Sequence, residues 1–134
     1  NIKNYELYVC DGNTYKSEEV DVVIFNLPYF KTKKEEQSEN RFLNLAKHED
    51  NFTLESMIEC INRNLKNNGT LFFLFQTSRL NEVLKLLSKK HIIVKEMKFV
   101  YDINKENSNI FMIRAVKNAK EGMVVTKPII IKRR

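Results

Sequence analysis

The sequence predicts an α/β domain whose sheet is mostly parallel, with an antiparallel edge formed by its C-terminal part. Two observations support this prediction. The segments VDVVIF (20–25) and TLFFLF (70–75) are almost continuously apolar, as strands covered on both faces are. Segments with apolar residues at helical spacing follow each of these strands. This alternation of strands and helices is typical of α/β domains.

Composition limits the possibilities further. The chain has 134 residues, enough for one domain with a modest core, and is 43% hydrophobic and 30% charged. Its longest apolar runs are far shorter than the roughly 20 residues of a membrane span, and no secretory signal opens the chain. The net charge of +6 permits a nucleic-acid partner without requiring one. Cys10 and Cys60 lack metal-ligand spacing, so we expect two reduced core thiols in a cytoplasmic protein.

The first elements are strands. Residues 5–10 (YELYVC) form a predicted strand that ends at the turn signal Asp11-Gly12. Residues 20–25 form the second strand. The polar, poorly periodic segment 31–51 predicts a long loop, and a loop of that length in a compact domain is usually functional.

Two helices follow the loop. Thr53 is the expected N-cap of the first, and Asn68-Gly69 its expected end. Its apolar positions are Leu54, Met57, Ile58, Ile61 and Leu65. Ser78 is the expected cap of the second helix. One face of that helix carries Leu80, Val83, Leu84 and Leu87.

The remaining segments read as strands. They cover residues 70–75 between the helices, and then 92–101, 109–117 and 123–131. The last three follow one another without a helix, which predicts the antiparallel edge.

Polar residues follow the first two strands. Ligands of open α/β sheets bind beyond the carboxyl ends of the strands, where Asp11 and Asn26 are expected. Pro28 stiffens the turn after Asn26 and restricts Leu27 to an extended conformation, which aims the carbonyl group of Leu27 in a fixed direction.

The tetrapeptide Asn26-Leu27-Pro28-Tyr29 resembles the Asn/Asp-X-Pro-Tyr/Phe motif of amino-methyltransferases that use S-adenosylmethionine. An exocyclic adenine amine is a poor nucleophile because its lone pair is delocalised into the ring. The resemblance implies that the Asn26 side chain and the Leu27 carbonyl accept hydrogen bonds from this amine and free the lone pair. It implies that Tyr29 stacks on a flipped-out base. Many family members have proline at the position of Leu27, which keeps the carbonyl. The alternative is an ordinary turn in which Tyr29 packs on the core.

The resemblance extends over essentially the whole chain. The segments DVVIFNLPYFK, LAKHED and LFFLFQTSRL are similar to those of bacterial tRNA adenine-N6 methyltransferases, which modify the adenosine 3′ of the anticodon in a valine tRNA. This family implies a Rossmann-like class I methyltransferase fold. It implies S-adenosylmethionine as the methyl donor, with Asp11 near the adenine of the donor and Asn26 beside the reacting groups.

One family feature is absent from the sequence. These enzymes hold the donor with a glycine-rich loop and an acidic residue that binds its ribose, whereas this chain has three glycines and no G-x-G. By this resemblance, residues 1–134 are the C-terminal portion of one methyltransferase domain whose N-terminal strands are missing. We expect the chain alone to be inactive, and to associate with itself or with a missing N-terminal half.

Basic residues lie on the predicted substrate side. Those expected to contact RNA phosphates are Lys31, Lys33, Lys34, Lys47, His48 and Arg79. The alternative for the loop lysines is a solvated surface, because three glutamates dilute their charge. The alternative for Arg79 is an ion pair with a carboxylate of its own helix.

The resemblance therefore implies an RNA-modifying methyltransferase, a transferase that methylates N6 of an adenine in tRNA. Other targets of the same motif remain open: ribosomal RNA, DNA and a protein glutamine, each with a planar amine or amide. A non-catalytic α/β module that binds RNA or a partner chain is the alternative of a different class.

Overall fold

The computed structural model describes residues 3–26 and 52–132. The elements follow in the order β1 (Val20–Asn26), α3 (Leu54–Asn64), β2 (Leu65–Gln76), the 3-10 turn η2 (Thr77–Arg79), α4 (Leu80–Lys89), β3 (Ile92–Asp102), β4 (Ile110–Lys117), β5 (Val124–Val125) and β6 (Ile129–Ile131). No helix in these ranges has the length and apolar character needed to cross a membrane. The loop predicted for 31–51 lies outside the described residues.

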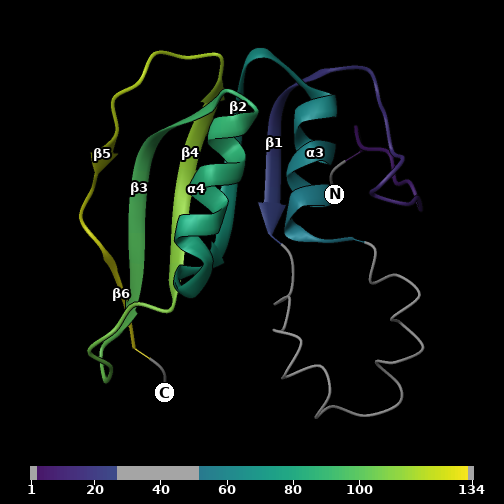
Figure 1. Ribbon diagram of the computed structural model, residues 1–134. Coiled ribbons are helices and arrows are strands. Elements are labelled where there is room, and N and C mark those ends of the chain that lie inside the picture. Colours follow the sequence, from purple (N-terminus) through teal and green to yellow (C-terminus); the bar gives the residue numbers. More distant parts are fainter. Residues whose placement is uncertain (1–2, 27–51, 133–134) are drawn as a thin grey trace.

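The strands form one mixed sheet in the order β1-β2-β4-β3-β5, with β6 also paired to β3 (Figure 1). β1 is parallel to β2, and β5 and β6 are parallel to β3. Among the described strands, β4 alone runs in the opposite direction, antiparallel to both of its neighbours, β2 and β3. The mostly parallel sheet is thus confirmed, but its antiparallel strand is interior. The reason is the order of the connections. The chain crosses from β2 through α4 to β3 and leaves room for one strand between them, and β4 takes this position after a short connection from β3.

Both helices pack on one face of the sheet, which we name the inner face. Figure 1 shows α4 in front of the central strands. The buried core joins apolar residues of both helices to alternate residues of the strands. Its largest fully buried side chains are Phe111, Leu54, Met57, Ile58, Ile61, Leu65, Leu71, Leu87, Ile92 and Val83. The helical spacing seen in the sequence therefore predicted the buried positions of α3 correctly, whereas in α4 Val83 and Leu87 are buried and Leu80 and Leu84 are only partly buried.

The opposite face of the sheet, which we name the outer face, carries the intervening side chains. Its central members are Val22, Ile24, Asn26, Phe72, Leu74, Met112, Arg114, Glu96 and Lys98. Ile24 is 76% exposed and Phe72 is 43% exposed. Within the described residues, no helix covers this face.

The predicted strand at 5–10 is wrong. Residues 3–10 have no regular structure, and Leu7 and Val9 are almost fully exposed. A strand is stable only when its backbone groups pair with a neighbour, and no described strand pairs with this segment. Cys10 is consequently exposed instead of lying in the core, whereas Cys60 of α3 is buried, and both are free thiols.

The first helix ends earlier than predicted. Thr53 does cap α3, but the chain leaves the helix after Asn64, and Leu65 pairs with Val20 of β1. Asn68 and Gly69 instead form an irregularity inside β2, where Asn68 has a φ of 63°. A Cβ on Gly69 would approach the carbonyl oxygen of Lys66 to 2.8 Å, so this glycine permits the tight backbone path.

Two further details differ from prediction. Ser78 does not cap α4, because the chain first forms η2, and no side chain caps the helix. The strand predicted for 123–131 is divided into β5 and β6. Pro128 lies between them, and proline has no backbone N–H for a ladder hydrogen bond.

Candidate active site

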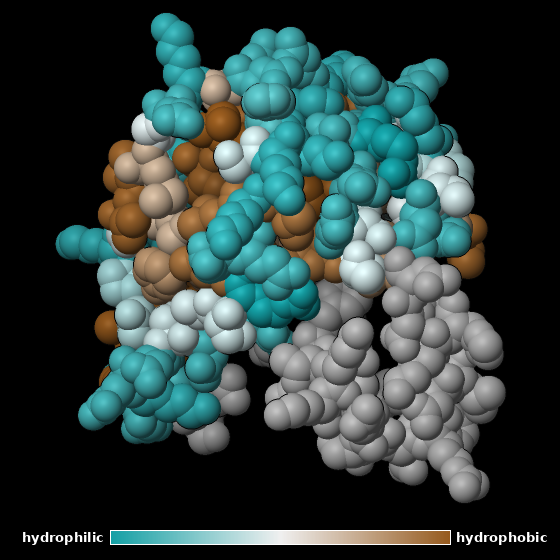
Figure 2. Space-filling model, in the orientation of Figure 1, coloured by the Kyte–Doolittle hydropathy of each residue, from teal (hydrophilic) through white to brown (hydrophobic). Residues whose placement is uncertain are grey.

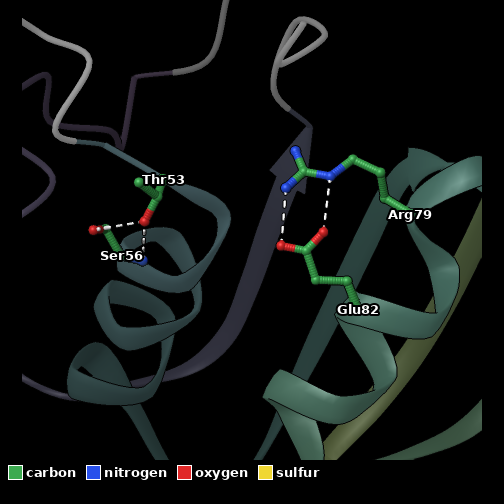
Figure 3. Close-up of polar contacts among 4 residues, drawn as sticks. All are labelled: Thr53, Ser56, Arg79 and Glu82. Carbon is green, nitrogen blue, oxygen red and sulfur yellow. Dashed lines mark hydrogen bonds and ion pairs between the residues drawn. The ribbon is translucent and has the colours of Figure 1, made fainter. Parts of the chain in front are cut away.

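The candidate site lies at the sheet edge where β1 and β2 end. Both strands are parallel, so their carboxyl ends meet there, and α3 and α4 begin at the same edge. Figure 3 shows the first residues of both helices on either side of the tip of β1. This is the edge at which α/β sheets bind their ligands.

Asn26 is the last residue of β1 and is exposed. It pairs with Leu74 of β2, two residues before that strand ends, so the ladder fixes its backbone position. A side-chain amide held at the end of a rigid strand can accept and donate hydrogen bonds beyond the sheet. The structure therefore places Asn26 where the sequence predicted it.

The start of α3 is fixed beside this edge. The hydroxyl oxygen of Thr53 accepts the Ser56 N–H at 3.1 Å, and the two hydroxyl groups lie 3.1 Å apart (Figure 3). Such caps stabilise a helix by about 1 kcal/mol. The cap thereby fixes the point at which α3 begins at this edge.

Arg79 lies at the beginning of α4. Its guanidinium group donates two hydrogen bonds to the Glu82 carboxylate, at 3.0 and 3.1 Å (Figure 3). The same group lies over the ring of Phe75, 5.5 Å from its centre. The alternative of an ion pair within the helix is therefore what the structure shows. A phosphate ligand would have to compete with Glu82 for Arg79.

Asp11 lies in a compact turn. Its backbone carbonyl accepts the N–H groups of Thr14 and Tyr15, at 3.1 and 2.8 Å, and its carboxylate accepts the Asn13 N–H at 2.9 Å. Gly12 touches the ring of Phe52, the residue before the cap of α3. In Figure 1 this turn lies on the far side of α3 from β1. The structure does not bring Asp11 and Asn26 into one pocket.

Two residues that sequence reasoning missed hold the segment containing Asp11. Arg63 donates to the carbonyl oxygens of Gly12 and Tyr15, at 2.9 and 3.2 Å. Asn64 is only 6% exposed; its Nδ2 donates to the Tyr15 carbonyl, and its Oδ1 accepts from the Ser17 N–H at 2.6 Å. A buried polar group that loses its partners costs about 1–3 kcal/mol. The sequence did carry a signal that Asn64 is buried, because this residue follows Ile61 by three positions and therefore lies on the apolar face of the helix.

Burial changes one titratable group near this segment. Removal from water raises the pKa of the Cys60 thiol, although the nearby positive charge of Arg63 opposes the shift. Cys60 therefore stays protonated and unreactive, as expected of a structural thiol.

The other predicted site residues lie outside the described residues. They are Leu27, Pro28, Tyr29, Lys31, Lys33, Lys34, Lys47 and His48. Of the predicted site, the described ranges contain Asp11, Asn26 and Arg79.

A hollow of about 390 Å³ lies on the outer face and includes Asn26 at one end. Its floor is mainly apolar, from Ile24, Phe72 and Met112. Charged side chains at its other end include Arg114 and Glu96, which form an ion pair at 3.4 Å. Asp11 is not among its lining residues.

The described residues fit only part of a nucleoside-type methyl donor. Exposed acceptors at Asp11 and Asn26 suit the exocyclic amine of an adenine and a reacting amine. No glycine-rich turn exists in the chain for the rest of such a donor. Within the described ranges, no group of three acidic, histidine or cysteine side chains could hold a metal ion.

Comparison with curated proteins identifies a similar sequence. A protein named tRNA1(Val) (adenine(37)-N6)-methyltransferase, from Shewanella woodyi, is 26% identical over 126 residues. The match covers 91% of this chain and 50% of that protein, so the chain spans about half the length of this relative. No family model matches the chain.

Solved structures show the fold. M1.HpyAVI has a TM-score of 0.55 at 16% identity, covering 94% of this chain and 66% of that one. A protein described as a class I S-adenosylmethionine-dependent methyltransferase, from Listeria monocytogenes, has a TM-score of 0.52 at 17% identity, with 87% and 37% covered. A protein described as a DNA modification methylase, from Thermus thermophilus, has a TM-score of 0.51 at 14% identity, with 87% and 54% covered.

Proposed function

We propose that this chain is the C-terminal portion of an S-adenosylmethionine-dependent methyltransferase that modifies N6 of an adenine in tRNA. The starting point is that the chain has the class I methyltransferase fold and resembles the bacterial tRNA adenine-N6 methyltransferases in sequence, as predicted. One observation carries the proposal: Asn26 is the exposed last residue of a parallel strand, and Leu-Pro-Tyr follows it directly in the sequence.

The chemistry follows from the acceptors. The Asn26 side-chain oxygen and the Leu27 carbonyl each accept one N–H of the target amine, which localises the lone pair on nitrogen. Tyr29 stacks on the base after it leaves its helix, a contact worth about 1–3 kcal/mol. S-adenosylmethionine, when bound, supplies the electrophilic methyl group. Holding the amine in this orientation contributes the larger part of catalysis.

Two residues are assigned to the donor. Asn26 lies beside the reacting groups. The assignment of the Asp11 carboxylate to the exocyclic amine of the donor's adenine rests on the sequence resemblance alone, because Asp11 does not line the hollow that includes Asn26. The remainder of the donor is bound by residues outside this chain. We therefore expect residues 1–134 alone to bind the donor weakly and to be inactive.

The lysines of the loop and His48 are assigned to RNA phosphates, together with Arg79. Such contacts determine affinity and register but carry no base specificity. The name of the similar Shewanella protein favours tRNA as the substrate, and a cytoplasmic location accords with this. Ribosomal RNA, DNA and a protein glutamine present comparable groups and belong in the substrate panel of any test.

Three substitutions in the complete natural protein test the proposal. Asn26→Ala should lower turnover on tRNA about 10²–10³-fold, because a preorganised acceptor is lost. Tyr29→Ala should weaken capture of the base by about 1–3 kcal/mol. Leu27→Pro is the matched control and should be nearly silent, because the carbonyl group remains.

The readout is methyl transfer from radiolabelled donor to a panel of tRNA, ribosomal RNA and DNA, with RNA binding measured separately. Binding should barely change in any variant, since it depends mainly on phosphate contacts. If Asn26→Ala retained full transfer while Leu27→Pro abolished it, the segment would be a structural turn and the proposal would be wrong.

A further inference from the structure

Two surfaces of the sheet lack a partner within the described residues. One is the outer face, where Val22, Ile24 and Phe72 are exposed. The other is the edge of β1 that faces away from β2, which we name the free edge; β1 is the first strand in the sheet order and pairs with β2 alone among the described strands. Val22 and Ile24 belong to β1, so the outer face and the free edge are continuous.

The free edge of β1 differs from the edge at the other end of the sheet. There, β5 and β6 have two and three residues, and Pro128 lies between them. Short strands and prolines are among the means by which proteins prevent an edge from pairing with another strand. β1 has seven residues, VDVVIFN, with no proline and one charged side chain, that of Asp21. The free edge is therefore suited to pairing with a further strand, whereas the opposite edge is protected from it.

The connections of the chain indicate where a cover for the outer face comes from. The chain passes from β1 through α3 to β2, and from β2 through α4 to β3, in both cases away from the free edge. β2 and β3 are both antiparallel to β4, and are therefore parallel to each other. Connections between parallel strands are right-handed in about 98% of cases, so crossovers in one direction place their helices on one face, here the inner face. Helices on the outer face therefore require crossovers in the opposite direction, to strands beyond β1.

The similar proteins are long enough to supply such strands and helices. This chain spans about half the length of the Shewanella relative, so a comparable length of that protein lies outside the match. Parallel sheets are normally covered on both faces, and β2 is apolar at every position from Leu71 to Phe75, as a doubly covered strand is. The hollow on the outer face has a mainly apolar floor, which suits the apolar side chains of a covering helix.

We propose that the outer face and the free edge of β1 are the interface with the remainder of the same domain: parallel strands extend the sheet beyond β1, and their connecting helices cover the outer face. This inference rests on the part of the proposed function that makes the chain one portion of a longer domain. Because Asn26 lines the hollow, the covering helices form a wall beside this residue. The natural occupant is thus another part of the same polypeptide and not a second copy of residues 1–134.

The test is the accessibility of single cysteines in the complete natural protein and in the 134-residue chain. Ile24→Cys and Phe72→Cys report on the outer face, and Lys85→Cys, on the exposed surface of α4, is the matched control. All three are made in a Cys10→Ser background, because Cys10 is exposed whereas Cys60 is buried. Reaction with a maleimide is followed at each site by mass spectrometry.

The outer-face cysteines should react about 100-fold more slowly in the complete protein than in the isolated chain at low concentration, because labelling then requires local opening. The rate at Lys85→Cys should change less than twofold. If the isolated chain fails to fold, the comparison is made inside the complete protein, where Ile24→Cys and Phe72→Cys should react about 100-fold more slowly than Lys85→Cys.

Hydrogen exchange of the unmodified complete protein tests the free edge without any substitution. The backbone N–H groups of β1 that point away from β2 should be protected about 100-fold, because they pair with the added strand. The N–H groups of β5 that point away from β3 are the matched control and should exchange freely. Unprotected groups along β1 would overturn the extension of the sheet.

The labelling outcomes separate the possible occupants. Slow labelling of the outer face in the complete protein, independent of protein concentration, supports the proposal. Fast labelling there would overturn it, because the face would be open to water. Protection that appears only as concentration rises would assign the face to a second copy, and slow labelling in the isolated chain at low concentration would assign it to residues 1–134 themselves; either result would also overturn it.

None of these measurements depends on methyl transfer. A complete protein whose outer face is covered and whose β1 edge is protected, but which methylates no adenine in tRNA, would contradict the proposed function and leave this inference standing. A complete protein that methylates tRNA with its outer face open would contradict this inference alone.

Discussion

The two faces of the sheet are built from the same strands but have different surroundings. On the inner face, Phe73 and Phe111 are almost fully buried under α3 and α4. On the outer face, Ile24 and Phe72 are exposed over the hollow that includes Asn26. Figure 2 shows the solvent side of the helices that cover the inner face. Hydrophilic side chains cover most of this surface, and hydrophobic residues are visible between them.

The difference shows that apolar composition alone did not determine burial. β2 reads Leu71-Phe72-Phe73-Leu74-Phe75, apolar at every position, so both of its faces are suited to being covered. Within the described residues, only one face is. Exposed apolar patches of this kind mark surfaces that bind other protein. The following predictions test whether the outer face differs energetically from the inner face, or only lacks its partner here.

The largest effect is expected at adjacent phenylalanines of β2. Phe73→Ala should destabilise the chain by about 3–5 kcal/mol, because Phe73 is 3% exposed and packs against two other rings. The centre of its ring lies 5.4 Å from that of Phe75 and 6.4 Å from that of Phe111. Phe72→Ala, the matched control, should cost about 1 kcal/mol since its ring is 43% exposed. Urea unfolding of the 134-residue chain measures both. Equal costs would mean that the outer face is covered in solution.

A smaller effect is expected on association through the outer face. Ile24→Lys should weaken self-association, or binding to another part of the same fold, by about 1.5–3 kcal/mol, the contribution of burying one such side chain. Light scattering over a range of concentrations gives the dissociation constant, which should rise more than tenfold. Lys85→Glu, on the exposed surface of α4, is the control. A strictly monomeric chain at high concentration would contradict this prediction.

Much of the fold was predictable because it depends on local patterns. The runs at 20–25 and 70–75 became β1 and the end of β2, and Thr53 caps α3 as expected. The strand predicted for 5–10 failed for a physical reason: a strand requires a neighbour, and no described strand pairs with this segment. Propensity describes what a segment can do, whereas pairing depends on the rest of the molecule.

The candidate site was predictable to a similar degree. Asn26 is at its predicted position because a single continuous strand, β1, defines it. The partner of Arg79 was left open, since the sequence shows Glu82 three residues away but not which ligand is preferred. Arg63 and Asn64 were missed. The place of Asn64 on the apolar face of α3 was a signal of burial, but the sequence does not show that the partners of these two side chains are backbone groups almost 50 residues earlier.

Removal of the N-cap of α3 should lower the free energy of unfolding modestly. Thr53→Ala removes the acceptor for the Ser56 N–H and should cost about 1 kcal/mol. Ser78→Ala is the matched control at the start of α4 and should cost little, because α4 has no side-chain cap. Urea unfolding again provides the comparison. A larger cost for Ser78→Ala would show that η2 is replaced by a capped helix in solution.

The smallest effect concerns the ion pair in the middle of the outer face, and it is the most sensitive test of the comparison. Glu96 and Arg114 are partners on β3 and β4 and are about 40% exposed, at 39% and 40%. An ion pair in contact with water contributes about 0–1 kcal/mol, so Glu96→Gln should change the free energy of unfolding of the isolated chain by less than about 0.5 kcal/mol. Asp21→Asn, at the Asp21–Lys66 pair of 3.3 Å, should behave alike as the exposed control.

The same substitution should be costly once a partner covers the outer face. Water would then be excluded, and Arg114 would lose Glu96, its acidic partner within the described residues. An uncompensated buried charge costs about 3–5 kcal/mol. Glu96→Gln measured in the complete natural protein should therefore reach that range, while Asp21→Asn stays below about 1 kcal/mol. A cost that is small in both contexts would show that the outer face remains open to water. The difference in burial between the two faces of the sheet would then be a property of the fold itself and would not result from the absence of a partner.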